Sequence, residues 1–158
     1  MAERLELDTY FLKIASVVAE RATCLRHHVG ALAARDKHIL ATGYNGAPSG
    51  LPDCLTLGCL RDELNIPSGE RHEICRAIHA EQNVIIQAGL HGVSLEGSTI
   101  YCTHTPCRLC AKMLVNARIA RYVSFGRYRD DIFTDLFKDA GIEMVMQDRP
   151  PDGIGYLD

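Results

Sequence analysis

Two short segments rich in histidine and cysteine constrain this chain more than any other feature of its sequence. The first is the tripeptide HAE at 79–81, and the second is the pentapeptide PCRLC at 106–110. Each overlaps the start of an apolar run that predicts a helix. The run AEQNVIIQAG begins at Ala80 in the first segment, and the run RLCAKMLVNA begins at Arg108 in the second. Both segments therefore lie at helix starts, where unpaired backbone N–H groups and the positive end of the helix dipole favour thiolates and anions.

These residue types match the ligands of a hydrolytic zinc site. Such sites take three protein ligands from His, Cys and carboxylate, and they leave one position open for water. His79, Cys107 and Cys110 supply three ligands, and the Cys-x-x-Cys spacing lets one helical turn present both sulfurs to one metal. Glu81 then remains free to act as a base on the bound water. Taken singly, His-x-Glu is a common helix start and Cys-x-x-Cys also occurs in redox pairs and structural zinc sites, so the prediction depends on their occurring together.

Composition limits the remaining classes. A length of 158 residues suits one domain over 1–158, with a core at about 5–147 and a C-terminal tail at 148–158. The formal net charge of −3 offers no attraction to nucleic acid or an anionic membrane. The N-terminus lacks the apolar region of a secretory signal, and no apolar run is long enough to cross a membrane. Seven cysteines suit metal ligands or buried thiols in a reducing compartment. We therefore expect a cytoplasmic protein with neither nucleic-acid nor membrane partners.

The hydrophobic pattern predicts an α/β chain. We expect helices at 8–24 with Asp8 as N-cap, at 79–88 ended by Gly89, at 107–117, and at 131–140 ended by Gly141. We expect strands at 29–35, 38–44, 98–103, 120–126 and 142–147, the first two joined by a tight turn at 36–37. The glycines of the loop at 43–50 permit close approach of a ligand, and the irregular segment 51–78 is long enough to need a function or a fixing point. This order predicts a five-stranded mixed sheet with helices on both faces.

The combination of His-x-Glu with a later Pro-Cys-x-x-Cys is the signature of zinc-dependent nucleobase deaminases. Three segments extend the match, namely GYNGAPSG at 43–50, the cysteine-bearing insertion before HAEQN at 79–83, and YCTHTPCRLCAKMLVNA at 101–117. Over about residues 5–147 the chain resembles the cytidine/deoxycytidylate deaminase superfamily, and within it the deoxycytidylate (dCMP) deaminases and late-competence (ComEB-type) proteins. The resemblance implies a three-layer α/β/α sandwich, zinc held by His79, Cys107 and Cys110, and Glu81 as proton shuttle.

The resemblance also implies a reaction. Zinc-bound hydroxide attacks C4 of the pyrimidine, and Glu81 passes protons to N3 and to the leaving ammonia, so that dCMP becomes dUMP. Another base or nucleoside, such as guanine or cytidine, remains open as the substrate. A non-catalytic, zinc-stabilised nucleotide-binding or DNA-uptake-related module also remains open, although the intact Glu81 argues against it. Related dCMP deaminases are often oligomeric and regulated by dCTP and dTTP, which makes a homo-oligomer and these effectors expectations here.

Further residues are assigned by the resemblance and by residue type. We expect substrate contacts from Asn45, Asn83 and His104, with a turn asparagine, a helix-surface residue and a surface histidine as the simpler alternatives. The cations expected near a 5′-phosphate are Arg26, His27, His28, Arg127 and Arg129. A second, structural zinc is expected at Cys24, Cys54 and Cys75, with His72 or Cys59 as the fourth ligand and free thiols as the alternative. Cys102, inside a strand, is expected in the core.

Overall fold

The structure is a computed structural model that describes residues 3–126 and 132–149. Its helices are α1 (Leu7–Ala19), α2 (Cys54–Leu57), α3 (Leu60–Glu63), α4 (Ala80–Leu90), α5 (Arg108–Asn116) and α6 (Ile132–Ala140), with a 3-10 turn at His72–Ile74. Its strands are β1 (Gly30–Arg35), β2 (His38–Tyr44), β3 (Thr99–Cys102), β4 (Arg121–Phe125) and β5 (Glu143–Gln147). They form one sheet in the order β2-β1-β3-β4-β5. Strand β1 runs antiparallel to β2 and β3, whereas β3, β4 and β5 are parallel, which confirms the predicted mixed sheet.

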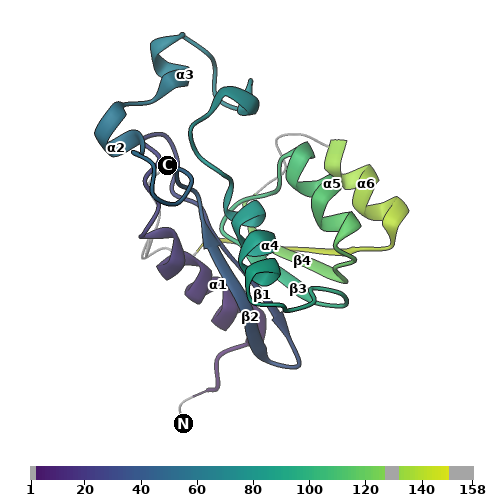
Figure 1. Cartoon of the computed structure of the whole chain (residues 1–158). Helices are drawn as coiled ribbons and strands as arrows, with labels where there is room; N and C mark the ends of the chain where they lie inside the picture. The colour runs from purple at the N-terminus through teal and green to yellow at the C-terminus, as the bar shows by residue number, and fades with distance from the viewer. Residues whose placement is uncertain (1–2, 127–131, 150–158) are drawn as a thin grey trace.

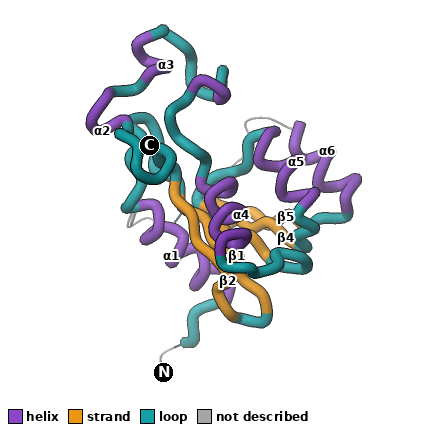
Figure 2. The backbone as a smooth tube through the Cα atoms, in the orientation of Figure 1, coloured by secondary structure: helices purple, strands orange, loops and turns teal. Residues whose placement is uncertain are grey.

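Helices cover both faces of the sheet, as Figures 1 and 2 show. The alternation along β1 places Leu32 in a core with α1 and Ala33 in a core on the opposite face. The α1 core also contains Phe11, Leu12, Ala15, Tyr101 and Val123. The opposite core is built from α4, α5 and α6 and contains Val84, Ile100, Leu114, Tyr122 and Phe137. The predicted three-layer α/β/α sandwich is therefore confirmed.

Two glycines let helices pack against the sheet at backbone distance. A Cβ at Gly30 would lie 2.1 Å from the carbonyl oxygen of Ala15 in α1. A Cβ at Gly43 would lie 2.4 Å from the carbonyl oxygen of Ala80, the first residue of α4. Any side chain at either position would displace a helix. The close approach at Gly43 is thus made by α4 rather than by a ligand, and it fixes the helix start that carries His79.

Two predicted helix ends are wrong. Helix α1 ends at Ala19 rather than near Cys24, because the following chain pairs with the loop after β2 through a hydrogen bond from the Thr23 N–H to the Asn45 carbonyl. Helix α4 continues through Gly89 to Leu90. The predicted turn between β1 and β2 is confirmed, since both of its central residues, at 36 and 37, have positive φ angles of 52° and 67°.

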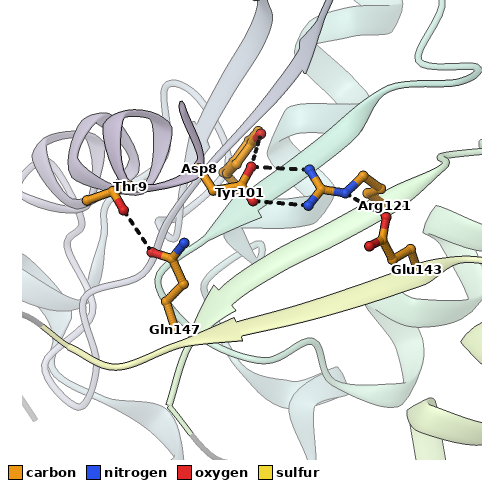
Figure 3. Close-up of polar contacts among 6 residues, drawn as sticks. All are labelled: Asp8, Thr9, Tyr101, Arg121, Glu143 and Gln147. Atoms are coloured by element: carbon orange, nitrogen blue, oxygen red, sulfur yellow. Dashed lines mark hydrogen bonds and ion pairs between the residues drawn. The ribbon is translucent and has the colours of Figure 1, made fainter. Parts of the chain in front are cut away.

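A polar cluster joins α1 to the sheet (Figure 3). One oxygen of Asp8 accepts hydrogen bonds from Tyr101 Oη at 2.8 Å and Arg121 Nη1 at 3.1 Å, and the other accepts from Arg121 Nη2 at 3.0 Å. Arg121 Nε donates to Glu143 Oε2 at 2.9 Å. The predicted N-cap role of Asp8 is therefore wrong. Glu6 is the N-cap, because the charge-assisted bonds to Arg121 hold the Asp8 carboxylate against the sheet instead.

The insertion at 51–78 is more ordered than its sequence indicated. It contains α2, α3 and the 3-10 turn, and the Asp53 side chain caps α2 by accepting from the N–H groups of Leu55 and Thr56. Backbone hydrogen bonds between Gly46 and Ile78 join its end to the loop after β2. Figure 1 shows α2 and α3 extending beyond one end of the sheet. In the part of the chain that the structure describes, no helix is long and apolar enough to cross a membrane.

Candidate active site

The two predicted helix starts converge in space. His79 is the N-cap of α4, Cys107 is the N-cap of α5, and Cys110 lies in the first turn of α5. The Sγ atoms of Cys107 and Cys110 lie 3.4 and 3.3 Å from Nδ1 of His79. All three ligand atoms lie within 4.8 Å of one another, and among the described residues no other group of three metal-ligating side chains is as close.

This donor set fits zinc. Tetrahedral zinc has Zn–N bonds of about 2.0–2.1 Å and Zn–S bonds of about 2.3 Å, which separate nitrogen and sulfur ligands by about 3.5 Å. The two observed Sγ–Nδ1 distances of 3.4 and 3.3 Å are close to this value. One imidazole and two thiolates also leave the fourth position of a catalytic zinc site open. The residues that would hold the ion are therefore His79, Cys107 and Cys110.

The surroundings of the two sulfurs favour a thiolate. Cys107 Sγ accepts the backbone N–H of Cys110 at 3.4 Å, at the positive end of α5. Hydrogen bonds from Cys110 and His79 lower the pKa of the Cys107 thiol to about 3. The hydrogen bond to Cys107, together with burial, raises the pKa of Cys110. A cation bound between the sulfurs would replace the proton that the pair shares.

Two neighbours fix the orientation of His79. Its backbone N–H donates to Gln82 Oε1 at 2.9 Å. Its Nε2 lies 3.2 Å from Nδ1 of His72, and Nε2 of His72 lies 3.0 Å from the Gly69 carbonyl oxygen. With Nδ1 of His79 on a metal, its Nε2–H donates to His72, which is the outer hydrogen bond that metal-bound histidines usually make. His72, a candidate for the second zinc, thus lies beside the first metal centre.

Glu81 lies in the first turn of α4 with only 4% of its surface exposed. Its burial raises the pKa of the carboxyl group. The Glu81 Oε1 atom lies 3.2 Å from the hydroxyl of Tyr122 in β4, and that hydroxyl donates to the His104 carbonyl at 2.7 Å. The thiol of Cys102 interacts with both Glu81 and Tyr122, and burial raises its pKa well above the usual value. Cys102 is buried in the core, as expected.

Sequence reasoning missed Tyr122. It belongs to no motif, and its hydroxyl reaches Glu81 only because the fold places Tyr122 and the start of α4 on the same face of the sheet. The available signal was a tyrosine in an otherwise buried strand, since buried tyrosine hydroxyls usually have a hydrogen-bond partner.

A cleft of about 970 Å³ opens over these groups. Its lining includes two of the candidate metal ligands, His79 and Cys107, and also Glu81, Phe125 and Phe133, while Cys110 is buried directly behind them. The insertion contributes Arg61, Ser68 and His72 to its wall. The cleft therefore combines a candidate metal centre, a buried carboxyl group and apolar surface suited to a flat ring.

The three predicted substrate contacts differ in position. Asn45 lines the cleft, but its side chain accepts the Val29 N–H at 2.9 Å and donates to the His27 carbonyl at 2.8 Å, so it holds the adjacent segment in place. Asn83 donates to the Tyr44 carbonyl at 2.8 Å and is absent from the described cleft lining. His104 lines the cleft, with Nδ1 2.8 Å from the hydroxyl of its neighbour Thr103.

Among the described residues, only one of the predicted phosphate-binding cations, His27, lines the cleft. Arg26 is paired with Asp62 at 2.6 Å, His28 is not in the lining, and Arg127 and Arg129 lie outside the described residues. Three other cations line the cleft, namely Arg61, Arg108 and Arg149. Arg108 lies within the PCRLC segment but had no predicted role, and Arg61 and Arg149 belong to no motif.

Arg61 is unusual among these cations because only 5% of its surface is exposed. One of its nitrogens donates to the Glu70 carbonyl at 2.9 Å, while its buried Nε has no hydrogen-bond partner within the described part of the chain. A buried guanidinium with an unused donor favours an anionic group nearby.

The second cysteine cluster lies in and beside the insertion. Cys24, Cys54 and Cys59 are buried and Cys75 is half-buried. Burial and the neighbouring thiols of Cys24, Cys75 and Cys59 raise the pKa of Cys54. No three of these sulfurs lie within 4.8 Å of one another in the described structure, so a shared ion would have to draw them together.

Comparison with known proteins identifies the family. The family model described as cytidine and deoxycytidylate deaminase zinc-binding region matches residues 5–126. Deoxycytidylate deaminase of Saccharomyces cerevisiae is 35% identical over 136 residues, which cover 85% of this chain and 43% of that protein. ComE operon protein 2 of Bacillus subtilis is 36% identical over 141 residues, which cover 89% of this chain and 70% of that protein.

A solved structure agrees with these sequences. The dCMP deaminase from cyanophage S-TIM5, in complex with dCMP and dUMP, superposes with a TM-score of 0.73 at 27% identity, covering 92% of this chain and 100% of that one. The chain spans less than half the length of the two yeast deoxycytidylate deaminases that it matches, 43% of one and 46% of the other. The family match and the convergence of His79, Cys107 and Cys110 show that this chain belongs to the cytidine and deoxycytidylate deaminase family and carries its zinc-binding region.

Proposed function

We propose that this chain is a zinc-dependent dCMP deaminase that converts dCMP and water to dUMP and ammonia. The observation that carries the proposal is the buried Glu81 in one cleft with His79 and Cys107, which converge with the buried Cys110 into one ligand set. Relatives named deoxycytidylate deaminase, and the cyanophage enzyme solved with dCMP and dUMP, support the choice of substrate.

The residues of the cleft divide the chemistry among them. Zinc bound in such a site supplies a water whose pKa is lowered to about 7. Glu81 accepts a proton from the attacking water, delivers it to N3 of the pyrimidine, and then helps to protonate the departing ammonia. A carboxyl group whose pKa is raised by burial suits this exchange, because it takes and returns a proton more readily near neutral pH.

The same cleft offers partners for a 5′-phosphate. His27, Arg61, Arg108 and Arg149 all line it. We infer that His27 contributes to phosphate binding, so His27→Gln should raise KM for dCMP about tenfold and leave deoxycytidine turnover unchanged. The neighbouring His28→Gln is a matched control, because His28 is not in the described cleft lining. An equal loss on both substrates would remove His27 from the phosphate site.

We also propose a second, structural zinc at Cys24, Cys54 and Cys75, with Cys59 as the fourth ligand. Support comes from the interaction of the Cys54 thiol with those of Cys24, Cys75 and Cys59. Cys59 is preferred as the fourth ligand because His72 is engaged with His79 and Gly69. Such an ion would help to order the insertion that forms part of the cleft wall. The protein should then bind two zinc ions per chain and Cys54→Ser only one; a single ion in the wild type would refute the second site.

Ammonia release from dCMP, CMP, deoxycytidine, cytidine and guanine by the zinc-loaded protein tests the proposed reaction. Rapid turnover of dCMP with much slower turnover of deoxycytidine is the expected result. Preference for guanine or a free nucleoside would keep the zinc chemistry and overturn the nucleotide assignment. No turnover of any substrate by a zinc-loaded chain would favour the binding-module alternative.

Oligomerisation and regulation extend the same proposal. A homo-oligomer is tested by the molar mass of the purified chain in solution. Regulation by dCTP and dTTP is tested by adding each at a dCMP concentration below KM, where an effector should change the rate most.

A further inference from the structure

We propose that Tyr122 is the positioning residue that holds the Glu81 carboxyl group in place through the reaction; this rests on the proposed function. Tyr122 lies in β4 with no exposed surface. Its hydroxyl lies 2.7 Å from the His104 carbonyl oxygen and 3.2 Å from Glu81 Oε1. One atom of β4 thereby connects the start of α4 to the segment between β3 and α5.

The hydroxyl is not needed to fill space. The Tyr122 ring packs in the apolar core against Phe137, with ring centroids 5.6 Å apart, and a phenylalanine would make the same contact. A buried hydroxyl costs free energy unless it is hydrogen-bonded, so its presence in this core calls for partners. Its two oxygen partners belong to the site, since Glu81 follows His79 and His104 precedes Cys107, and the buried Cys102 thiol also interacts with the hydroxyl.

A hydroxyl suits a position between two such neighbours. It can both donate and accept a hydrogen bond, unlike a backbone carbonyl, which only accepts. The His104 carbonyl at 2.7 Å fixes the Tyr122 oxygen, and that oxygen lies 3.2 Å from Glu81 Oε1. The Glu81 carboxyl group therefore has a fixed hydrogen-bond partner that defines its position.

The neighbouring strand supplies a matched control. Tyr101 in β3 is 3% exposed, and its hydroxyl donates to the carboxylate of Asp8 at 2.8 Å. In the sheet, Tyr101 pairs with Val123 and Tyr122 pairs with Ile100, so the two tyrosines occupy opposite faces. Tyr101→Phe removes the same atom and the same kind of bond, but on the face that lacks the metal centre.

The experiment compares Tyr122→Phe with Tyr101→Phe in the full, zinc-loaded chain. Tyr122→Phe should lower kcat for dCMP by about tenfold, the effect of one lost hydrogen bond, with KM and zinc content unchanged. In the Glu81→Gln background it should lower the residual rate no further. Tyr101→Phe should lose thermal stability and keep kcat.

Wild-type kcat in Tyr122→Phe would overturn the proposal, and so would a loss of rate that is matched by a loss of zinc. If Tyr122→Phe does not fold, 3-fluorotyrosine placed at 122 or at 101 keeps the hydroxyl but changes its hydrogen-bond strength. A change in kcat of about twofold or more is expected at 122 alone, and equal rates for the two would overturn the proposal.

Should the wild type release no ammonia from any substrate, the proposed function fails and Tyr122 is judged by crystal structures of the two zinc-loaded proteins. A displaced or multiply oriented Glu81 carboxyl group in Tyr122→Phe supports the positioning role, and an unchanged one overturns it.

Discussion

On each face of the sheet a carboxyl group lies against a tyrosine hydroxyl, and the two carboxyl groups have opposite surroundings. Asp8, on the α1 face, has a side chain 24% exposed and shares its charge with Arg121. Hydrogen bonding by Arg121 lowers its pKa. Glu81, on the other face, is 4% exposed and forms no ion pair with any Lys or Arg that the structure describes, and burial raises its pKa.

The comparison separates what a tyrosine does from what a cation does. Both carboxyl groups have the same hydroxyl partner, so the hydroxyl does not decide their charge. Arg121 decides it on the α1 face, where a permanent anion fastens the helix to the sheet. Glu81 has no such ion pair with a described arginine or lysine, so it can change protonation state. A buried carboxyl group of this kind costs stability, as functional groups commonly do.

The largest effect should follow removal of the exchangeable proton. Glu81→Gln should keep zinc and lower kcat by about 10² to 10⁴, the usual contribution of a general acid–base group. Asp8→Asn makes the same chemical change on the α1 face and should leave kcat unchanged. Zinc content and steady-state deamination of dCMP check both. Near-normal turnover by zinc-loaded Glu81→Gln would remove the distinction between the faces.

Part of the site and most of the sheet could be predicted from the sequence. His79, Glu81, Cys107 and Cys110 could be predicted because each pair is close in sequence and lies at the start of a recognisable helix. The sheet followed from apolar runs of strand length.

The rest depends on tertiary contacts. Tyr122 meets Glu81 only because the fold places β4 side chains and the start of α4 on the same face of the sheet. Arg61 enters the cleft from an insertion without periodicity. Asp8 looked like an N-cap because local sequence cannot reveal that Arg121, 113 positions away, competes for its carboxylate. The predicted ends of α1 and α4 were wrong because they too depend on contacts that local sequence does not reveal.

A smaller effect is expected at the outer partner of the metal centre. His72→Ala removes the group 3.2 Å from His79 Nε2 and should weaken zinc binding about 10- to 100-fold, as loss of outer-shell partners usually does. Competition with a chelator measures the affinity, and His28→Ala is a suitable control. Unchanged affinity would mean that the ligands are held by the two helix starts alone.

The contribution of Asp8 to stability should depend on pH. Asp8→Asn should lower the free energy of unfolding at pH 7 by about 1–2 kcal/mol through its weaker bonds to Arg121. Because the folded-state pKa of Asp8 is lowered, its contribution is complete above the unfolded value of about 3.9 and is lost as pH falls through the folded value. Urea unfolding at pH 7 and pH 3 measures this, and a difference that persists undiminished at low pH would contradict it.

In the metal-free protein, the ionisation of Glu81 should change stability with pH in the direction opposite to that of Asp8. Its folded-state pKa is raised, so the folded chain binds more protons than the unfolded chain, and stability falls as pH rises from about 4.3 through the folded value. Glu81→Gln should therefore be more stable than the wild type at pH 7. A less stable variant there would mean that the Glu81 anion is compensated in the folded chain.

The smallest expected effect tests whether the Asp8–Arg121 pair stabilises the fold because it is partly buried or simply because it is an ion pair. Glu143 also binds Arg121, at 2.9 Å, but its side chain is 63% exposed against 24% for Asp8. Solvent and salt screen such a pair, so Glu143→Gln should cost about 0–1 kcal/mol and less still near 1 M salt. Urea unfolding at low and high salt measures the difference. If Glu143→Gln costs as much stability as Asp8→Asn, partial burial does not explain the strength of the Asp8–Arg121 pair. The difference between Asp8 and Glu81 would then be due to the presence of Arg121 alone.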